Sequence, residues 1–341
     1  MYSLLRPLLF RLDPERAHTL TLTLLRWAGQ LPITHYLLRL LFEVNDPRLA
    51  VEAFGLKFKN PVGLAAGYDK NGIAVRGLGA LGFGHIEVGT VTRLPQPGHP
   101  RPRVQRVPEA QAVVNAMGFP NDGIEKLKVE SGKWQVAGGT QIGINIGKGK
   151  DTPLERAAED YCALLEQVYQ HADYVAVNVS SPNTLNLRQL QARAAMEALL
   201  KAIAAVRDGL SPRVPVLVKL APDLTESELD DALAAITACG MDGLIATNTT
   251  TRREGLPGYA IPLTGGLSGW PLRARATEVI RYLARHTALP IVGVGGIMSA
   301  DDALEKLDAG ARLVQVYTGL VYAGPGLIRS INQRLLKRRS R

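Results

Sequence analysis

Eight short apolar runs alternate with helical patterns along most of this 341-residue chain. Near-continuous apolar strands separated by amphipathic helices are typical of a parallel sheet that helices cover. Eight such units in about 290 residues favour a closed (β/α)8 TIM barrel, an α/β fold, over an open doubly wound sheet. The expected strands are residues 62–65, 85–91, 141–146, 174–179, 216–220, 243–247, 291–294 and 313–317.

Helical patterns fill most of the intervals between these strands, at residues 154–170, 192–208, 227–239, 272–286 and 300–309. We therefore expect a barrel domain over residues 49–336. A helical extension over residues 1–42 precedes it, and a basic tail over 337–341 follows it. Asn45-Asp46-Pro47 reads as a linker. The loop at 252–263 carries no informative motif.

Polar or glycine residues lie at the carboxyl end of every expected strand or just beyond it. In a barrel the carboxyl ends of the strands converge on the face where ligands bind. Polar groups at all eight ends predict a site that contacts a large polar ligand from all sides. The residues are Asp69, Lys70, Thr90, Asn145, residues 178–183, Lys219, residues 247–249, Gly295, Gly296, Tyr317 and Thr318.

Three glycine-bearing segments follow the last strands, at residues 265–269, 293–296 and 317–319. Loops after the seventh and eighth strands of barrels commonly bind phosphate through backbone amides. Tight turns explain any one of these glycines. Three sets on one face favour a phosphate-bearing cofactor.

Two further glycine patterns do not indicate nucleotide binding. Residues 77–82 match GxGxxG, but they precede a strand instead of linking a strand to a helix. We interpret them as a helix end and turn. Residues 143–149 lack the spacing and the Ser or Thr of a P-loop.

Lysines and asparagines at the strand ends indicate the chemistry of the ligand. Lys70 and Lys219 point toward a partly desolvated pocket, where an unpaired ammonium is costly, so they are expected to meet anions. Amide side chains both donate and accept, which suits a planar heterocycle with mixed edges. The candidates are Asn115, Asn145, Asn178, Asn183 and Asn248.

The first 42 residues combine large apolar side chains with isolated arginines. Asp13 and Pro14 begin a helix in which Ala17, Leu20, Leu24, Trp27 and Leu31 define one face. Such a segment can lie in a membrane interface or pack on the main domain as a helical hairpin. No run approaches the roughly 20 apolar residues of a spanning helix, and no signal peptide is evident.

Several motifs together resemble the quinone-dependent (class 2) dihydroorotate dehydrogenases across essentially the whole chain. The matching segments are Asp13 to His18 at the front, Asn60 to Gly72 around the first strand, Asn178 to Thr184 after the fourth, and Gly265–Gly269 with Gly293–Ile297 in the late loops. The resemblance implies a flavoprotein oxidoreductase of pyrimidine (UMP) biosynthesis that uses FMN, dihydroorotate and a respiratory quinone.

The resemblance also implies roles for individual residues. Ser181 would be the catalytic base. FMN would be held by Ala66, Gly67, Lys70, Thr90, Asn145, Asn178, Lys219, Thr247, Gly269, Gly296, Tyr317 and Thr318. Dihydroorotate would be held by Lys70, Asn115, Ala116, Met117, Gly118, Phe119, Asn178, Asn183, Asn248 and Thr249. Thr318 replaces the usual serine but keeps a hydroxyl, and Ala116 stands where arginine is frequent.

These residue types suit the implied reaction, in which hydride leaves C6 of the substrate for FMN and a base removes a proton from C5. Lys219 could stabilise negative charge on the reduced ring, and Lys70 could pair with the substrate carboxylate. A neutral serine hydroxyl is a weak base, so Ser181 needs an onward acceptor, such as a water held with Thr184.

Two features favour the quinone class within the family. Soluble relatives that use fumarate or NAD carry a cysteine in place of Ser181 and lack the N-terminal helices. We expect two helices to form an apolar mouth for quinone, with His18 and Arg103 lining the tunnel beside Tyr317.

The net charge of +9 favours anionic neighbours, which include acidic lipid. Two cysteines in so long a chain indicate a reducing compartment. We expect a monomer bound peripherally to the phospholipid surface of a bacterial inner membrane, on its cytoplasmic side, without a nucleic-acid partner. The six histidines show no metal-ligand spacing.

Two other functions remain open from the residues. One is a flavin barrel that acts on a dihydropyrimidine or dihydrouridine. The other is a non-redox barrel that binds a phosphorylated metabolite and uses its N-terminal helices as a docking surface, which predicts a colourless protein.

Overall fold

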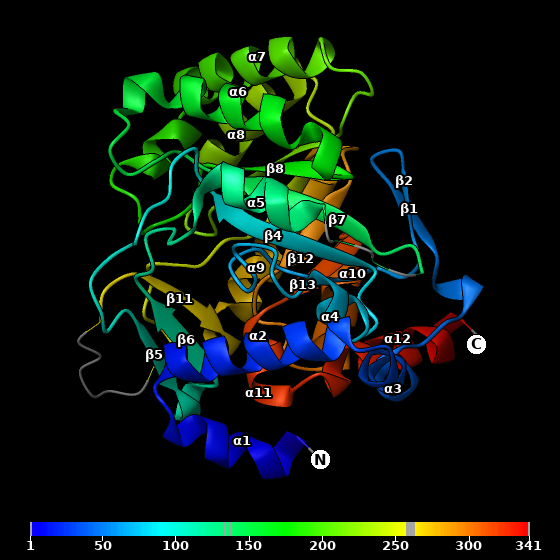
Figure 1. Ribbon diagram of the computed structural model, residues 1–341. Coiled ribbons are helices and arrows are strands. Elements are labelled where there is room, and N and C mark those ends of the chain that lie inside the picture. Colours follow the sequence, from blue (N-terminus) through cyan, green and yellow to red (C-terminus); the bar gives the residue numbers. More distant parts are fainter. Residues whose placement is uncertain (1, 133, 135, 137, 257–262, 340–341) are drawn as a thin grey trace.

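The computed structural model describes residues 2–132, 134, 136, 138–256 and 263–339. Its centre is a closed barrel of eight parallel strands, which confirms the predicted fold (Figure 1). Four strands end one residue earlier than expected, and the other four match. In order around the barrel they are β3 (Val62–Leu64), β4 (His85–Val91), β7 (Gln141–Ile146), β8 (Tyr174–Asn178), β9 (Val216–Leu220), β10 (Gly243–Ala246), β12 (Ile291–Val294) and β13 (Leu313–Val316).

Helices cover the outside of the barrel with their apolar faces turned to the strands. They are α4 (Val75–Gly79), α5 (Gly123–Ser131), α6 (Ala157–Val168), α7 (Arg193–Asp208), α8 (Glu226–Ala238), α9 (Arg273–His286), α10 (Ala300–Asp308), α11 (Thr318–Ala323) and α12 (Gly326–Arg339). The helix expected at 154–170 is shorter, because 3-10 turns flank α6 on both sides. The tail expected from residue 337 begins inside α12, and residues 340–341 lie outside the described chain.

Among the described residues, five strands outside the barrel were not expected from the sequence. The hairpin β1 (Val51–Ala53) and β2 (Leu56–Phe58) precedes the barrel, and β5 (Val104–Val107), β6 (Ala112–Asn115) and β11 (Gly266–Gly269) form a separate antiparallel sheet. Residues 265–269 were expected to be a glycine loop. Most of them instead form β11, because their backbone pairs with β6. Residues 257–262 of the uninformative loop lie outside the described chain.

The amino end of the barrel is filled by aromatic and aliphatic side chains. Phe54 and Phe58 of the β1–β2 hairpin contact each other, and Phe54 contacts Tyr174 inside the barrel. Gly143 provides room for the Tyr174 ring, because a Cβ atom at residue 143 would lie 2.2 Å from it. This apolar plug closes one end of the barrel, so a ligand enters from the carboxyl ends of the strands.

Three helices, instead of two, form the N-terminal extension: α1 (Tyr2–Arg11), α2 (Pro14–Gln30) and α3 (Pro32–Phe42). Only α1 and α2 lie near the carboxyl end of the barrel, whereas α3 packs against α2 and α12 (Figure 1). Asp13 caps α2 as expected, accepting hydrogen bonds from the amides of Glu15 and Arg16. None of the described helices has the length and apolarity needed to cross a membrane.

The face predicted for α2 is divided in two. Ala17 is buried together with Leu22 and Gly29, which pack toward the barrel. The other predicted members of the face are exposed on the opposite side of the helix: Leu20, Leu24, Trp27 and Leu31.

The GxGxxG pattern is a helix-packing site, not a nucleotide loop. Its first glycine, Gly77, lies in α4, and Gly82 ends the following turn with a φ of +91°. Helix α2 crosses α4 so closely that a Cβ atom on Gly77 would lie 2.0 Å from the carbonyl oxygen of Leu25. A Cβ atom on Gly29 would lie 2.4 Å from the backbone nitrogen of Gly77. Two glycines therefore set the distance between the extension and the barrel.

We predict that Gly77→Ala destabilises the protein by about 1–3 kcal/mol, because the added methyl group must push two helix backbones apart. The measurement is the free energy of unfolding from a urea titration. Gly326→Ala is the matched control, because nothing lies within 4 Å of a Cβ atom at that position in α12. Equal stabilities of the two variants would contradict the close packing of α2 on α4.

Candidate active site

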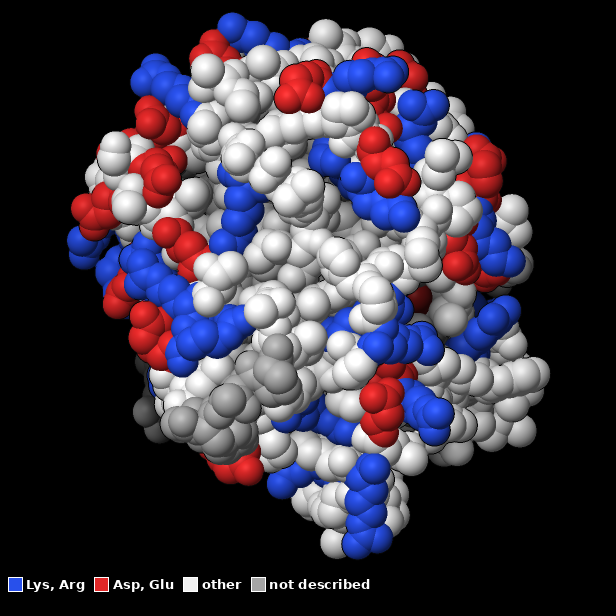
Figure 2. Space-filling model, turned by 90° about the vertical axis from the view of Figure 1, so that its left-hand side faces the viewer, with Lys and Arg blue, Asp and Glu red and all other residues white. Residues whose placement is uncertain are grey.

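A cavity of about 270 Å³ opens at the carboxyl ends of the barrel strands. Figure 2 views this side of the molecule, where charged residues of both signs are interspersed around a largely uncharged middle. The cavity wall contains most of the residues expected to bind cofactor and substrate: Ala66, Gly67, Lys70, Thr90, Asn115, Met117, Gly118, Phe119, Asn178, Ser181, Asn183, Lys219, Thr247, Asn248, Thr249, Gly269, Gly296, Tyr317 and Thr318.

Asn145 and Ala116 are the two members of those sets outside the cavity wall. Asn145 lies fully buried behind Thr90 and acts on the site through hydrogen bonds. The backbone amide of Ala116 donates to the carbonyl oxygen of Arg103.

A buried carboxylate, Glu87 of β4, lies inside the barrel below the cavity. Its Oε1 accepts from Asn145 Nδ2 (2.8 Å) and is 3.4 Å from Lys219 Nζ. Its Oε2 accepts from Gln315 Nε2 (2.7 Å) and Tyr174 OH (3.4 Å). Sequence reasoning missed Glu87 and Gln315. The available signal was a charged residue in the middle of a strand expected to be buried.

Amides and hydroxyls from neighbouring strands form one hydrogen-bonded network above Glu87. Thr90 Oγ1 donates to Asn145 Oδ1 (2.5 Å), and Asn178 Nδ2 donates to Thr90 Oγ1 (2.9 Å). Asn248 Nδ2 donates to Asn178 Oδ1 (3.2 Å) and to Ser180 Oγ (3.0 Å). Because the strands are parallel and adjacent, their ends hold these short side chains side by side.

Ser181 follows β8 and is buried in the cavity wall, with 5% of the residue exposed. Its Oγ accepts a hydrogen bond from the amide of Asn183 (3.2 Å). Asn183 Nδ2 donates to Asn115 Oδ1 (2.9 Å), which connects this loop to β6. The arrangement brings a hydroxyl and two amides together at one end of the cavity.

Lys70 supplies a cation at the same end. Its Nζ donates to the carbonyl oxygen of Gly67 (2.6 Å). Burial, followed by the nearby Arg103 charge, lowers the pKa of Lys70 to about 8. An ammonium group in such surroundings gains from a bound anion, which supplies a charge partner.

The late loops form the other end of the polar surface. Ser268 Oγ and Thr318 Oγ1 are 2.8 Å apart, and both residues line the cavity. Gly269 and Gly296 have φ angles of +96° and +70°, a region that favours glycine. Ser268 was not among the predicted residues, although it lies in the predicted glycine segment.

The mouth of the cavity is apolar and is formed partly by the N-terminal extension. Leu9 and Phe10 of α1 line it together with Val104 and Val321, whereas His18 lies on the α2 side. The His18 ring makes an edge contact with Tyr68, which makes another with Tyr317. Burial lowers the pKa of His18 to about 4, so this histidine is neutral at pH 7.

Arg103, predicted to line the tunnel, is not in the cavity wall. Its guanidinium donates to Glu15 Oε1 through Nε and Nη2 (both 3.1 Å) and to the carbonyl oxygens of Pro97 and His99. The buried pair fastens the first turn of α2 to the loop before β5. Within the described chain, no three His, Cys, Asp or Glu side chains are grouped as metal ligands.

Comparison with known proteins identifies the family. The dihydroorotate dehydrogenase family model matches residues 48–338. The chain belongs to this family. It is 49% identical over 340 residues to a dihydroorotate dehydrogenase (quinone) of Roseiflexus sp. (strain RS-1), covering 99% of this chain and 94% of the relative.

Other relatives agree with this assignment. The quinone-type dihydroorotate dehydrogenase of Acidithiobacillus ferrooxidans is 51% identical, over 98% of this chain and 94% of the relative. The crystal structure of the Eimeria tenella dihydroorotate dehydrogenase with ferulenol superposes with a TM-score of 0.88 at 35% identity, over 96% of this chain and 91% of that one. Membership makes the chain an oxidoreductase and excludes the non-redox barrel.

We predict that Glu87→Gln destabilises the fold by about 3–5 kcal/mol, because it leaves the Lys219 ammonium buried without its counter-charge. The double variant with Lys219→Met should recover part of this loss. Urea unfolding measures both. The control is Glu197→Gln. The partner of Glu197, Lys201, is exposed and stays hydrated, so this variant should keep the wild-type free energy of unfolding. A Glu87→Gln protein as stable as the control would show that Glu87 does not support the barrel.

Proposed function

We propose that this chain oxidises dihydroorotate to orotate in pyrimidine biosynthesis, with FMN as hydride acceptor, Ser181 as base and a membrane quinone as final electron acceptor. The observation that carries the proposal is one cavity with two chemically different ends. Amides, hydroxyls and Lys70 line the barrel end, and apolar side chains of α1, β5 and α11, among them Leu9, Phe10, Val104 and Val321, line the mouth beside Arg106.

The residues present fit FMN. The cavity wall offers a buried cation at Lys219, side-chain amides, and the hydroxyl pair Ser268–Thr318 beside Gly269 and Gly296, which have positive φ angles. Gln315 Oε1 is also buried at this wall without a partner among the described residues, so it is free to accept from a ligand donor. When bound, FMN would accept the hydride and pass electrons onward. Lys219 would stabilise negative charge that develops beside it.

The substrate would bind at the end that contains Lys70 and the asparagines. Lys70 Nζ would pair with its carboxylate, and Asn115, Asn183 and Asn248 would hydrogen-bond the edges of the pyrimidine ring. Ser181 Oγ would accept the proton from C5 as hydride leaves C6, and its own hydroxyl proton would pass to a water, the onward acceptor that a neutral serine needs. The hydrogen bonds that fix these side chains before binding would reduce the reorganisation that the reaction requires.

The apolar mouth would admit quinone from a membrane. Among the described residues, all but four of the exposed large apolar side chains belong to residues 4–41; the four are Leu94, Val129, Leu185 and Trp270. The exposed α2 face and the exposed leucines of α1 would enter the lipid interface, while arginines of the extension would face lipid phosphates. Quinone would then reach the cavity without crossing water.

We predict that Ser181→Ala slows reduction of the bound flavin by dihydroorotate about 10²–10⁴-fold, the usual contribution of a positioned base. The yellow colour and flavin content should stay unchanged, because Ser181 lies at the substrate end. Anaerobic stopped-flow absorbance measures the rate at saturating dihydroorotate. Ser131→Ala, at the end of α5 and outside the cavity wall, is the control. Wild-type reduction by Ser181→Ala protein would reject Ser181 as base.

We predict that orotate binds less tightly as the pH rises above about 8, the pKa of the ligand-free Lys70 ammonium. Below this pH the cation is present and affinity should be constant. Above it the group loses its proton, and the dissociation constant should rise by up to about tenfold per pH unit. Titration of the flavin spectrum with orotate measures this constant. Lys70→Met should bind weakly with no such pH dependence, and a wild-type slope in this variant would assign the titration to another group.

A further inference from the structure

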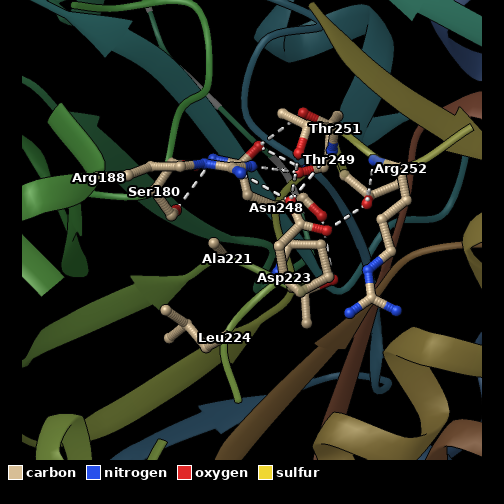
Figure 3. A network of polar contacts seen from close by, with 12 residues as sticks. Ser180, Arg188, Ala221, Asp223, Leu224, Asn248, Thr249, Thr251 and Arg252 are labelled. Carbon is tan, nitrogen blue, oxygen red and sulfur yellow. Dashed lines mark hydrogen bonds and ion pairs between the residues drawn. The ribbon is translucent and has the colours of Figure 1, made fainter. Parts of the chain in front are cut away.

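Arg188 joins three loops at the carboxyl end of the barrel. It lies in the 3-10 helix η5 (Leu187–Gln191), and its guanidinium extends toward the loops that follow β8, β9 and β10 (Figure 3). Nε donates to the carbonyl oxygen of Ser180 (3.1 Å), Nη1 to Asp223 Oδ2 (2.6 Å) and Nη2 to the carbonyl oxygen of Thr249 (2.8 Å). Each nitrogen therefore holds a different loop.

Asp223 is the fixed partner of this guanidinium. Its carboxylate also accepts from the Thr250 hydroxyl and from the Thr251 amide (3.0 Å). Burial alone would raise the pKa of Asp223, but these hydrogen bonds and the Arg188 charge outweigh it and lower the pKa. A charged Asp223 that is itself held by these hydrogen bonds fixes the orientation of the Arg188 guanidinium.

Arg188 contacts the backbone at two positions beside substrate-end residues, and one of them, Thr249, itself lines the cavity. Ser180 precedes Ser181, and Thr249 follows Asn248, whereas Arg188 and Asp223 are absent from the cavity wall. The bond from Arg188 to Ser180 also closes the segment 181–187 into a loop whose two ends are tied together. Leu185 in this loop is 83% exposed, so packing alone does not hold its outer part.

We propose that the Arg188–Asp223 pair is a positioning clamp that sets Ser181 and Asn248 relative to each other. The proposal rests on the proposed function for its kinetic consequences. A planar guanidinium can serve three acceptors in fixed directions, and a lysine ammonium cannot reproduce that geometry. The clamp therefore acts on the reaction with dihydroorotate and not on the reaction with quinone, whose mouth lies at α1 and α2.

The decisive variant is Arg188→Lys, which keeps a cation beside Asp223 but loses the three-way contact. The control is Arg193→Met, which removes an arginine paired with Asp231 (3.5 Å) on the exposed faces of α7 and α8. Two quantities are measured on the flavin-loaded, full-length protein. One is amide hydrogen exchange in residues 181–187 without substrate, and the other is the rate of each half-reaction in stopped-flow.

We expect Arg188→Lys to speed exchange in 181–187 and to slow flavin reduction by at least about tenfold, with flavin content and quinone reoxidation unchanged. Arg193→Met should match the wild type. Wild-type exchange and reduction in Arg188→Lys would overturn the clamp. A uniform loss of flavin, both half-reactions and thermal stability would also overturn it, in favour of a general structural role, and so would an Arg188→Lys protein that fails to fold.

Failure of the proposed function has a different signature. A wild-type flavoprotein that dihydroorotate does not reduce would reject the proposed substrate. The exchange comparison needs no substrate, so faster exchange in Arg188→Lys would support the clamp and unchanged exchange would reject it.

Discussion

The ion pair between Glu87 and Lys219 inside the barrel is the constraint on which the site depends. A carboxylate in a closed barrel is costly unless its lone pairs are satisfied, and Glu87 has four partners from four other strands. Below it lies the apolar plug around Phe58 and Tyr174. Above it, Lys219 and Asn145 are held where the polar network begins. The ion pair thus lies between the apolar core, which stabilises the barrel, and the polar surface of the cavity.

A second constraint places an apolar mouth over this polar surface. Gly29 and Gly77 allow α2 to touch α4, and Glu15 binds Arg103 at the other end of α2. With both ends of α2 fixed, His18 and the apolar residues of α1 are held in the cavity wall. In the proposed function, a polar anion would bind at one end of this cavity and an apolar electron acceptor at its mouth. Two chemically different ends suit an enzyme that would pass electrons from a polar substrate to an apolar acceptor.

The sequence predicts the barrel well, because periodic apolar runs and polar strand ends follow from local chemistry. Many cavity-wall residues could be predicted for the same reason, because they lie at or just beyond the end of a barrel strand, whereas residues 115–119 were expected only from the family resemblance. Strand β11 could not be predicted from the sequence, since Gly266–Gly269 becomes extended only by pairing with the distant β6. Glu87 was overlooked because its partners come from four separate strands. Arg103 and the divided face of α2 show the same limit. The spacing of apolar residues reveals an amphipathic helix, but tertiary contacts decide which side is buried.

The most direct test of the two-ended cavity is reoxidation of the reduced flavoprotein. The protein would be reduced anaerobically with dihydroorotate, then mixed with quinone dissolved in phospholipid vesicles or with fumarate in water, while the flavin absorbance is followed. The account predicts rapid recovery of the yellow spectrum with vesicle-borne quinone and none with fumarate. Recovery with fumarate and not with quinone would contradict it, because the mouth between α1 and α2 would then serve no electron acceptor.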